Sequence, residues 1–179
     1  MTTQFDPNIH AKRVATEVGA IGSILQRLGQ TIQRDQLVQK TTEDLRTFLQ
    51  VNRVVIYYFY NQWEGQVTFE ALSAREFSIY GSTGPDQCFN DEYAELYLAG
   101  RFRAIEDIET APIEPCHRDF LRHLRVRANL VVPILTNQGL WGLLVAHQCQ
   151  GPKAWSEMDV KRMQEGALTL ASAPSIKDY

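Results

Sequence analysis

Cysteine, charge of one sign and long apolar runs are all scarce in this sequence, and each scarcity excludes a class of protein. The three cysteines, Cys88, Cys116 and Cys149, are odd in number and widely spaced, which argues against a disulfide framework. No Cys-x-x-Cys pair or His/Cys cluster indicates a structural zinc site. A net charge of −3 and a pI near 5.8 give no electrostatic footprint for nucleic acid or an anionic membrane. The longest apolar runs, residues 129–135 and 140–146, are strand-sized, and no signal-peptide region begins the chain, so a cytoplasmic protein is expected.

The apolar positions that are present predict one domain with a helix at each end. Residues 11–32 place an apolar side chain at every third or fourth position, which is the helical period. Residues 156–172 repeat this pattern behind Ser156, a favourable N-cap. A chain of 179 residues with average composition can bury one core. We therefore predict a single domain over 1–179, with a core at about 35–155 and flanking signalling helices at 11–32 and 156–172.

Between these helices the pattern indicates a sheet that is rich in antiparallel pairs. Runs of β-branched and aromatic residues alternate with turn residues, as in hairpins. Pro133, inside one run, suggests a bulge or an edge position. The expected fold class is α+β, with helices at both ends and on one face of the sheet. The expected extended segments are 53–60, 66–74, 101–108, 128–135 and 140–148, the expected helices are 35–50, 92–99 and 116–125, and residues 78–90 are expected to form a loop.

Cys116 and His117 are the first candidates for chemistry. Cys116 follows Pro115 at the start of an expected helix, where the macrodipole and free amides favour a thiolate. His117 adds a group that donates a hydrogen bond or accepts a proton. A structural cysteine beside a surface histidine explains the same residues, whereas a papain-like nucleophile lacks its flanking signature.

Other candidates are weaker when each is taken alone. Cys88 lies in Asp86-Gln87-Cys88-Phe89, within a Gly/Pro loop, and an ordinary turn with a buried cysteine is the simpler interpretation. Strand alternation places His147 on one face with Trp141, Leu143 and Val145, where it is either a satisfied core residue or one end of a ligand pocket. Arg101 and Arg103 share a strand face that suits carboxylates, although a solvated pair is the commoner arrangement.

Taken together, these residues form a recognisable pattern. The run from Cys116 to Leu135, followed by 140–149 and 152–155, closely resembles the bilin-binding GAF domains of cyanobacteriochromes, which are compact relatives of phytochromes. Asp86-Gln87-Cys88-Phe89 is similar to the Asp-Xaa-Cys-Phe motif of their dual-cysteine subgroup and lies 28 residues before Cys116, as in that subgroup. The resemblance implies a GAF fold, in which a central antiparallel sheet is flanked by helices and the terminal helices pack together.

The resemblance also implies a photoreceptor and assigns roles to single residues. Cys116 would form a thioether with ring A of phycocyanobilin without a separate lyase. His117 would pack against the tetrapyrrole and hold its pyrrole protons, and His147 would approach ring D, the ring that rotates. Arg101 would bind a propionate through a bidentate fork, and Tyr97 would line the pocket.

The motif around Cys88 implies a second thioether. Addition of this thiol to the central methine bridge would shorten the conjugated system and give a violet or blue state. Z/E isomerisation at the bridge between rings C and D would release it and give a green or longer-wavelength state. Asp86 would select between protonation states of the pyrroles. Isomerisation of the pigment to phycoviolobilin is common in the subgroup and would favour green.

The sequence departs from the family pattern at two places, and it leaves two alternatives to a bilin photosensor open. Gln87 replaces the usual proline, and residues 109–115 lack a common Tyr-x-Ala-Gly pattern, which leaves the colours open. A GAF domain that binds a diffusible ligand such as a cyclic nucleotide would need neither thiol, and a thiol enzyme or redox sensor would be colourless. No kinase, cyclase or methyl-accepting segment is present, so we expect no enzyme activity beyond self-attachment and expect the output on other domains or another chain. The flanking helices suit a homodimer.

Overall fold

The computed structural model describes residues 7–61, 63–84 and 91–178, with the side chains of residues 7–16 and 91 left aside. Six strands of the described chain form one sheet in the order β3-β2-β1-β6-β5-β4, and every pair is antiparallel. The strands are β1 (Arg53–Asn61), β2 (Glu64–Leu72), β3 (Thr83–Gly84), β4 (Arg103–Ile105), β5 (Ala128–Thr136) and β6 (Gly139–Gln148). The helices are α1 (Pro7–Arg34), α2 (Gln36–Leu49), α3 (Asp91–Leu98), α4 (Pro115–His123), α5 (Glu157–Ala171) and α6 (Pro174–Lys177), with a 3₁₀ turn at Arg75–Phe77.

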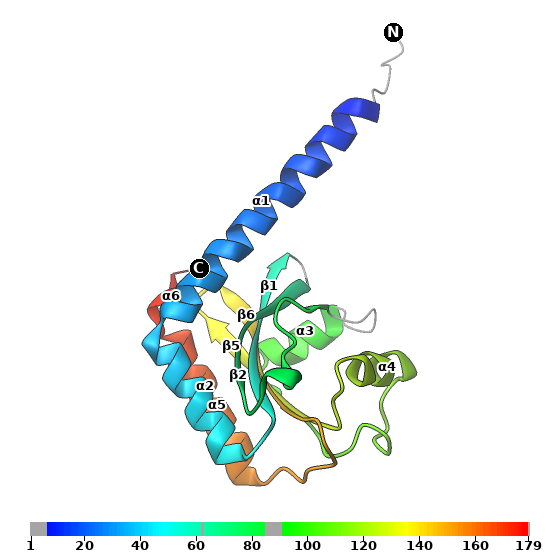
Figure 1. Ribbon diagram of the computed structural model, residues 1–179, viewed down its shortest axis with the longest axis vertical. Helices are drawn as coiled ribbons and strands as arrows, with labels where there is room; N and C mark the ends of the chain where they lie inside the picture. The colour runs from blue at the N-terminus through cyan, green and yellow to red at the C-terminus, as the bar shows by residue number, and fades with distance from the viewer. Residues whose placement is uncertain (1–6, 62, 85–90, 179) are drawn as a thin grey trace.

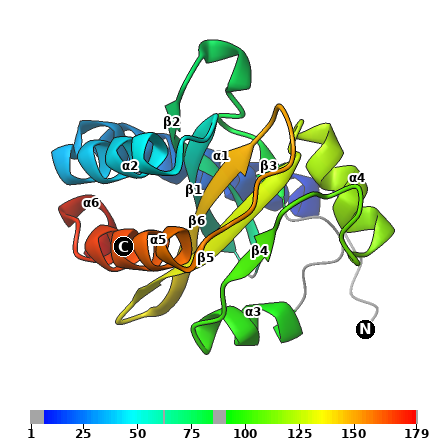
Figure 2. The ribbon, with the colours of Figure 1, turned by 90° about the horizontal axis from the view of Figure 1, so that it is seen from below.

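The helices divide between the two faces of the sheet (Figure 2). α2 and α5 cover one face, and the buried ends of α1 and α6 join them in the main hydrophobic core. α3 and α4 lie on the other side. Strand alternation sends Val54 and Ile56 into the main core and sends Val55 into a second cluster with Val131 and Val145. The sheet therefore separates a closed core from a second chamber, and that chamber contains the candidate site.

α1 extends far beyond the rest of the domain (Figure 1). Its C-terminal part buries Leu28 and Ile32 in the main core, whereas Val18 stays 64% exposed on the projecting part. Asp35 ends this helix and caps the next one, because its Oδ1 accepts hydrogen bonds from the amides of Leu37 and Val38, at 3.0 and 3.4 Å. α2 therefore begins directly after α1. None of the helices in the described chain is long and apolar enough to span a membrane.

The α+β prediction is confirmed, and so are most of its elements. Two short elements were missed: β3, which pairs with β2 inside the expected loop, and α6. Pro133 lies in β5, which is an inner strand between β4 and β6. The short strand β4 pairs with β5 only as far as Val131, so on the β4 side Pro133 has no strand neighbour that would need its missing N–H.

One facing prediction was wrong. Trp141 does not share the face of His147; it packs on Tyr58 in the main core, with ring centroids 4.8 Å apart. The cause is a register shift in which Ile134 pairs with Gly142 but the next residue of β5 pairs with Leu140. Trp141 is the extra residue of this bulge, so the alternation breaks there.

Candidate ligand-binding pocket

The second chamber is a pocket between the sheet and the two helices α3 and α4. The space between them, counted out through its open mouth into solvent, is about 1020 Å³. Its walls come from β1, β2, β4, β5, β6, α3, α4 and the segment 79–83. They are mainly apolar and aromatic, with Val55, Tyr57, Tyr97, Phe120, Val131 and Val145 among them. Such a chamber suits a large, mostly apolar ligand with a few polar groups.

α4 presents the cysteine–histidine pair at this pocket. Pro115 stands in the first turn of α4, where its missing N–H costs nothing, and Cys116 follows directly. The half-buried His117 lines the pocket, whereas Cys116 is exposed and is not among the lining residues. Cys116 is also disulfide-bonded in this structure, although the number and spacing of the cysteines argued against a disulfide framework. Any chemistry of a Cys116 thiolate therefore requires its reduction first.

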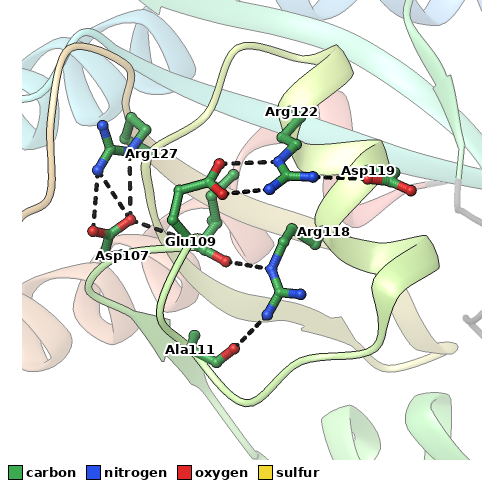
Figure 3. Close-up of polar contacts among 8 residues, drawn as sticks. Asp107, Glu109, Ala111, Arg118, Asp119, Arg122 and Arg127 are labelled. Carbon is green, nitrogen blue, oxygen red and sulfur yellow. Dashed lines mark hydrogen bonds and ion pairs between the residues drawn. The ribbon is translucent and has the colours of Figure 1, made fainter.

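Arginines on α4 tie this helix to the preceding loop (Figure 3). The Arg118 guanidinium donates to the backbone carbonyls of Ile108 and Ala111, at 2.8 and 2.7 Å. One turn further, Arg122 pairs with Glu109, and this ion pair holds the pKa of the Glu109 carboxyl below its usual value. The outer side of the helix is thus fixed, and its inner side, with His117, faces the pocket.

The same loop is attached to the start of the β5 region. Arg127 donates to both carboxylate oxygens of Asp107, at 3.1 and 3.0 Å. The amide of Glu109 and the Arg127 guanidinium together lower the pKa of Asp107. The indole of Trp155 donates to the carbonyl of Ile105 at 3.1 Å, which fixes the other end of the connection. α4 is therefore held at a defined place above the sheet.

Buried polar side chains of the sheet form another part of the pocket wall. Arg53 is completely buried, and its Nε donates to Nδ1 of His147 at 2.9 Å. Burial, reinforced by the charge of Arg53, lowers the pKa of His147 well below its ordinary value, so this imidazole is neutral. Asn129 pairs with His147 across β5 and β6 and also lines the pocket. This part of the wall can offer hydrogen bonds to a ligand but no carboxylate.

Tyrosine and arginine side chains line the α3 side. Tyr97 is buried in the lining, and burial raises its pKa to about 12, with the nearby charges of Arg103 and Arg101 acting the other way. Arg103 is half-buried in the wall, whereas Arg101 is exposed and outside it. Of this pair, Arg103 is the arginine that the structure brings to the pocket.

The predicted site residues are thus brought together in part. His117, His147 and Tyr97 line one pocket, while Asp86 and Cys88 lie outside the described residues. Sequence reasoning missed Arg53 and Asn129. A signal for both was available. Each is a polar residue near the start of an otherwise apolar strand, two positions before a valine that faces the pocket, Val55 or Val131.

Comparison with known families and proteins gives a consistent result. The model of the GAF domain family matches residues 33–173. An uncharacterized protein of Picosynechococcus is 49% identical over 159 residues, covering 89% of this chain and 98% of that protein. A putative methyl-accepting chemotaxis protein of Synechocystis is 34% identical over 156 residues, 87% of this chain, but this chain spans only 15% of that protein.

Solved structures share the fold. The GAF domain of PixJ from Thermosynechococcus elongatus, in its blue-light-absorbing form, is 36% identical with a TM-score of 0.65 over 74% of this chain and 83% of that chain. A phycocyanobilin-bound GAF domain from a cyanobacterial phytochrome is 29% identical with a TM-score of 0.67, over 84% and 91% of the two chains.

Proposed function

The chain belongs to the GAF domain family, and we propose that it is a photosensory member that holds a linear tetrapyrrole covalently on Cys116. The observation that carries this proposal is the large apolar pocket whose wall helix, α4, also bears Cys116 beside His117. Among similar structures, one is the blue-light-absorbing form of a photoreceptor GAF domain and another is bound to phycocyanobilin. The proposal explains both the apolar lining of the pocket and the cysteine on the helix that forms one of its walls.

The residues present fit such a pigment. A linear tetrapyrrole is a long conjugated system with apolar faces, two terminal lactams and two propionates. The apolar walls suit its faces, and half-buried Arg103 offers a guanidinium fork for a propionate. Asn129 leaves its side-chain oxygen buried without a hydrogen-bond partner among the described residues, as expected where a ligand supplies the donor. Arg101, which the resemblance assigned to a propionate, is exposed, so Arg103 is our assignment.

The protein's contribution is attachment, orientation and exclusion of water. The bilin supplies visible absorption and a double bond that isomerises in light. Cys116, once reduced, would add its sulfur and proton across a carbon–carbon double bond of the bilin, so no atom would be lost and no separate enzyme would be needed. His117, which lines the pocket from α4, would contact the pyrrole nitrogens, and His147, which lines it from β6, would contact the rotating terminal ring. Tyr97 packs beside the pigment.

We assign Cys88 and Asp86 to colour control. Addition of the Cys88 thiol to the central methine bridge divides the conjugated system and gives a violet or blue state, and its release gives a green or longer-wavelength state. Asp86 biases the protonation of the pyrroles. The bound pigment is phycocyanobilin or its isomer phycoviolobilin, and no enzymatic turnover is proposed for this domain beyond its own loading.

We also propose that the signal passes to output domains of a larger assembly. A relative named as a putative methyl-accepting chemotaxis protein contains a matching segment within a much longer chain. α1 projects from the domain with exposed Val18 and Ile24, and pairing of two copies along this helix would connect the pocket to such an output. Gel filtration with light scattering before and after illumination tests this pairing.

The central experiment separates Cys116 from the other described cysteine. Protein coexpressed with phycocyanobilin-forming enzymes, kept reduced, is run on a denaturing gel with zinc, which makes bound bilin fluoresce. We expect a fluorescent band for wild type and for Cys149→Ala, because Cys149 is a half-buried free cysteine outside the pocket lining. Cys116→Ala should lose the band. A labelled Cys116→Ala band contradicts the attachment site, and a colourless wild type favours a diffusible ligand such as a cyclic nucleotide.

A further inference from the structure

Three buried polar side chains form a row across neighbouring strands beside the pocket. Arg53 on β1 pairs in register with His147 on β6, and His147 pairs in register with Asn129 on β5. Their exposed fractions are 0%, 4% and 3%. Residues that are directly opposite in adjacent strands point to the same face of a sheet, so all three side chains share the pocket face.

Arg53 determines where the single proton of His147 lies. A guanidinium nitrogen only donates hydrogen bonds, so Nδ1 of His147, 2.9 Å from the Arg53 Nε, must accept and carries no proton. Because the ring is neutral, its proton is on Nε2. The other guanidinium nitrogens donate to the carbonyls of Phe77 and Leu124 at 2.8 and 2.6 Å, which keeps the guanidinium in place. His147 is therefore a hydrogen-bond donor through Nε2 and cannot act as an acceptor there.

Asn129 offers the complementary acceptor beside this donor. Its Oδ1 is buried and has no hydrogen-bond partner among the described residues. Among the described residues, the His147 ring makes one hydrogen bond, which is the one from Arg53 to Nδ1. Its Nε2–H therefore also remains for a ligand. A buried acceptor without a donor is costly, so Oδ1 of Asn129 favours a ligand that donates a hydrogen bond to it.

We propose that Arg53 is the positioning residue that keeps His147 a donor toward the terminal lactam ring, and that Asn129 supplies the acceptor for the same ring. This inference rests on the proposed function, because each terminal ring of a linear tetrapyrrole is a lactam with a carbonyl next to an N–H. The carbonyl accepts from Nε2–H of His147, and the lactam N–H donates to Oδ1 of Asn129. Only one orientation of the terminal ring would satisfy both His147 and Asn129, so these two residues would favour one isomer of the pigment over the other.

The first test uses the protein without bilin, so it is independent of pigment binding. In protein with ¹⁵N-labelled histidine, the ring nitrogens of His147 should show a protonated Nε2 and an unprotonated Nδ1 at neutral pH. A protonated Nδ1, or a cationic ring, overturns the role of Arg53. Arg53→Met should allow both neutral tautomers. The matched control is Arg125→Met, which removes a nearby guanidinium that donates to the Glu76 carbonyl and not to His147. This variant should keep the wild-type protonation of the His147 ring. If Arg53→Met does not fold, the wild-type spectrum still decides.

The second test uses the bilin-loaded protein. Asn129→Leu removes the acceptor at similar size, so loading on Cys116 should persist while the thermal reversion rate changes about tenfold, which corresponds to one lost hydrogen bond of about 1.4 kcal/mol. The lactam carbonyl band in the Raman spectrum should shift as well. Asn137→Leu, at an exposed turn position, is the control and should change neither. If Asn129→Leu is coloured and keeps both the wild-type reversion rate and the wild-type Raman carbonyl band, the proposed role of Asn129 beside His147 is wrong. A colourless wild type instead refutes the proposed function, and the histidine spectrum then stands alone.

Discussion

Replacing Arg118 by methionine should release α4 from the loop that precedes it. The guanidinium makes two hydrogen bonds to backbone carbonyls, at 2.8 and 2.7 Å. A buried hydrogen bond to a charged group contributes about 1.5–3 kcal/mol, and Arg118 is only half-buried, so we expect a total loss of about 2 kcal/mol. For a domain of this size that lowers Tm by about 4–8 °C. Methionine keeps the apolar stem, so the loss reports the hydrogen bonds.

The same substitution should slow covalent loading. Cys116 and His117 lie within two residues of Arg118 on α4, so a looser helix places the sulfur less accurately. The assay mixes reduced protein with excess phycocyanobilin and follows the growth of bound-pigment absorbance under single-turnover conditions. We expect the loading rate of Arg118→Met to fall at least about tenfold, with the final extent of loading unchanged.

Arg122→Met is the matched control, because it removes an arginine of the same helix that pairs with Glu109 at the surface. Exposed ion pairs contribute little, so its Tm and loading rate should stay close to wild type. If Arg118→Met loads at the wild-type rate despite a lower Tm, α4 is positioned by its apolar face alone and the reasoning fails. If both variants behave alike, the two carbonyl contacts have no special role.

Three further outcomes are expected. Cys88→Ala should keep its zinc-fluorescent band but lose the violet or blue state, so a persistent blue-absorbing dark state would contradict the second thioether. Asp35→Ala should lower the free energy of unfolding in urea by about 1 kcal/mol, because Asp35 caps α2 and accepts from the Ser175 amide at 3.0 Å. Burial acts to raise the pKa of Asp35, but the hydrogen bonds from Ser175, Val38 and Leu37 together outweigh it, so the pKa is lowered. The contribution of Asp35 to stability is therefore complete above the ordinary carboxyl pKa and is lost as pH falls through the lowered one. Gly166→Val should cost about 1–3 kcal/mol in the same assay, because an added Cβ would lie 2.6 Å from Leu45 Cδ1.

Most of the sheet could be predicted because its strands carry local signals. The two hairpins, β1–β2 and β5–β6, combine alternating apolar residues with turn residues, and both appear as expected. β3 could not be predicted, because its two residues gain strand geometry only from pairing with Gly65 and Gln66 of β2. The bulge at Trp141 was hidden for a similar reason, since it depends on register with another strand.

In the candidate site, too, the residues within a local motif could be predicted, whereas those that depend on contacts between distant segments could not. The sequence motif located His117 and His147, which do line one pocket. The hydrogen bond between Arg53 and His147 joins residues 94 positions apart, and no local pattern reports such a pair. Arg101 and Arg103 are equivalent in an alternating pattern, yet β4 begins at Arg103, so only the latter reaches the wall.

Arg53 and Arg118 both hold parts of the pocket wall through hydrogen bonds to groups that do not titrate. Their hydrogen bonds go to backbone carbonyls and to neutral His147, none of which gains or loses a proton over the ordinary pH range. The surface pair of Arg122 with Glu109 differs, because protonation of the Glu109 carboxyl, whose pKa is lowered, ends it as pH falls through that lowered value. Acid therefore weakens the outer attachment of α4 while the contacts of Arg118 persist. If the proposed pigment binds here, such a pocket would keep its geometry while the pigment gains or loses protons, so that its colour would report light and not solvent pH.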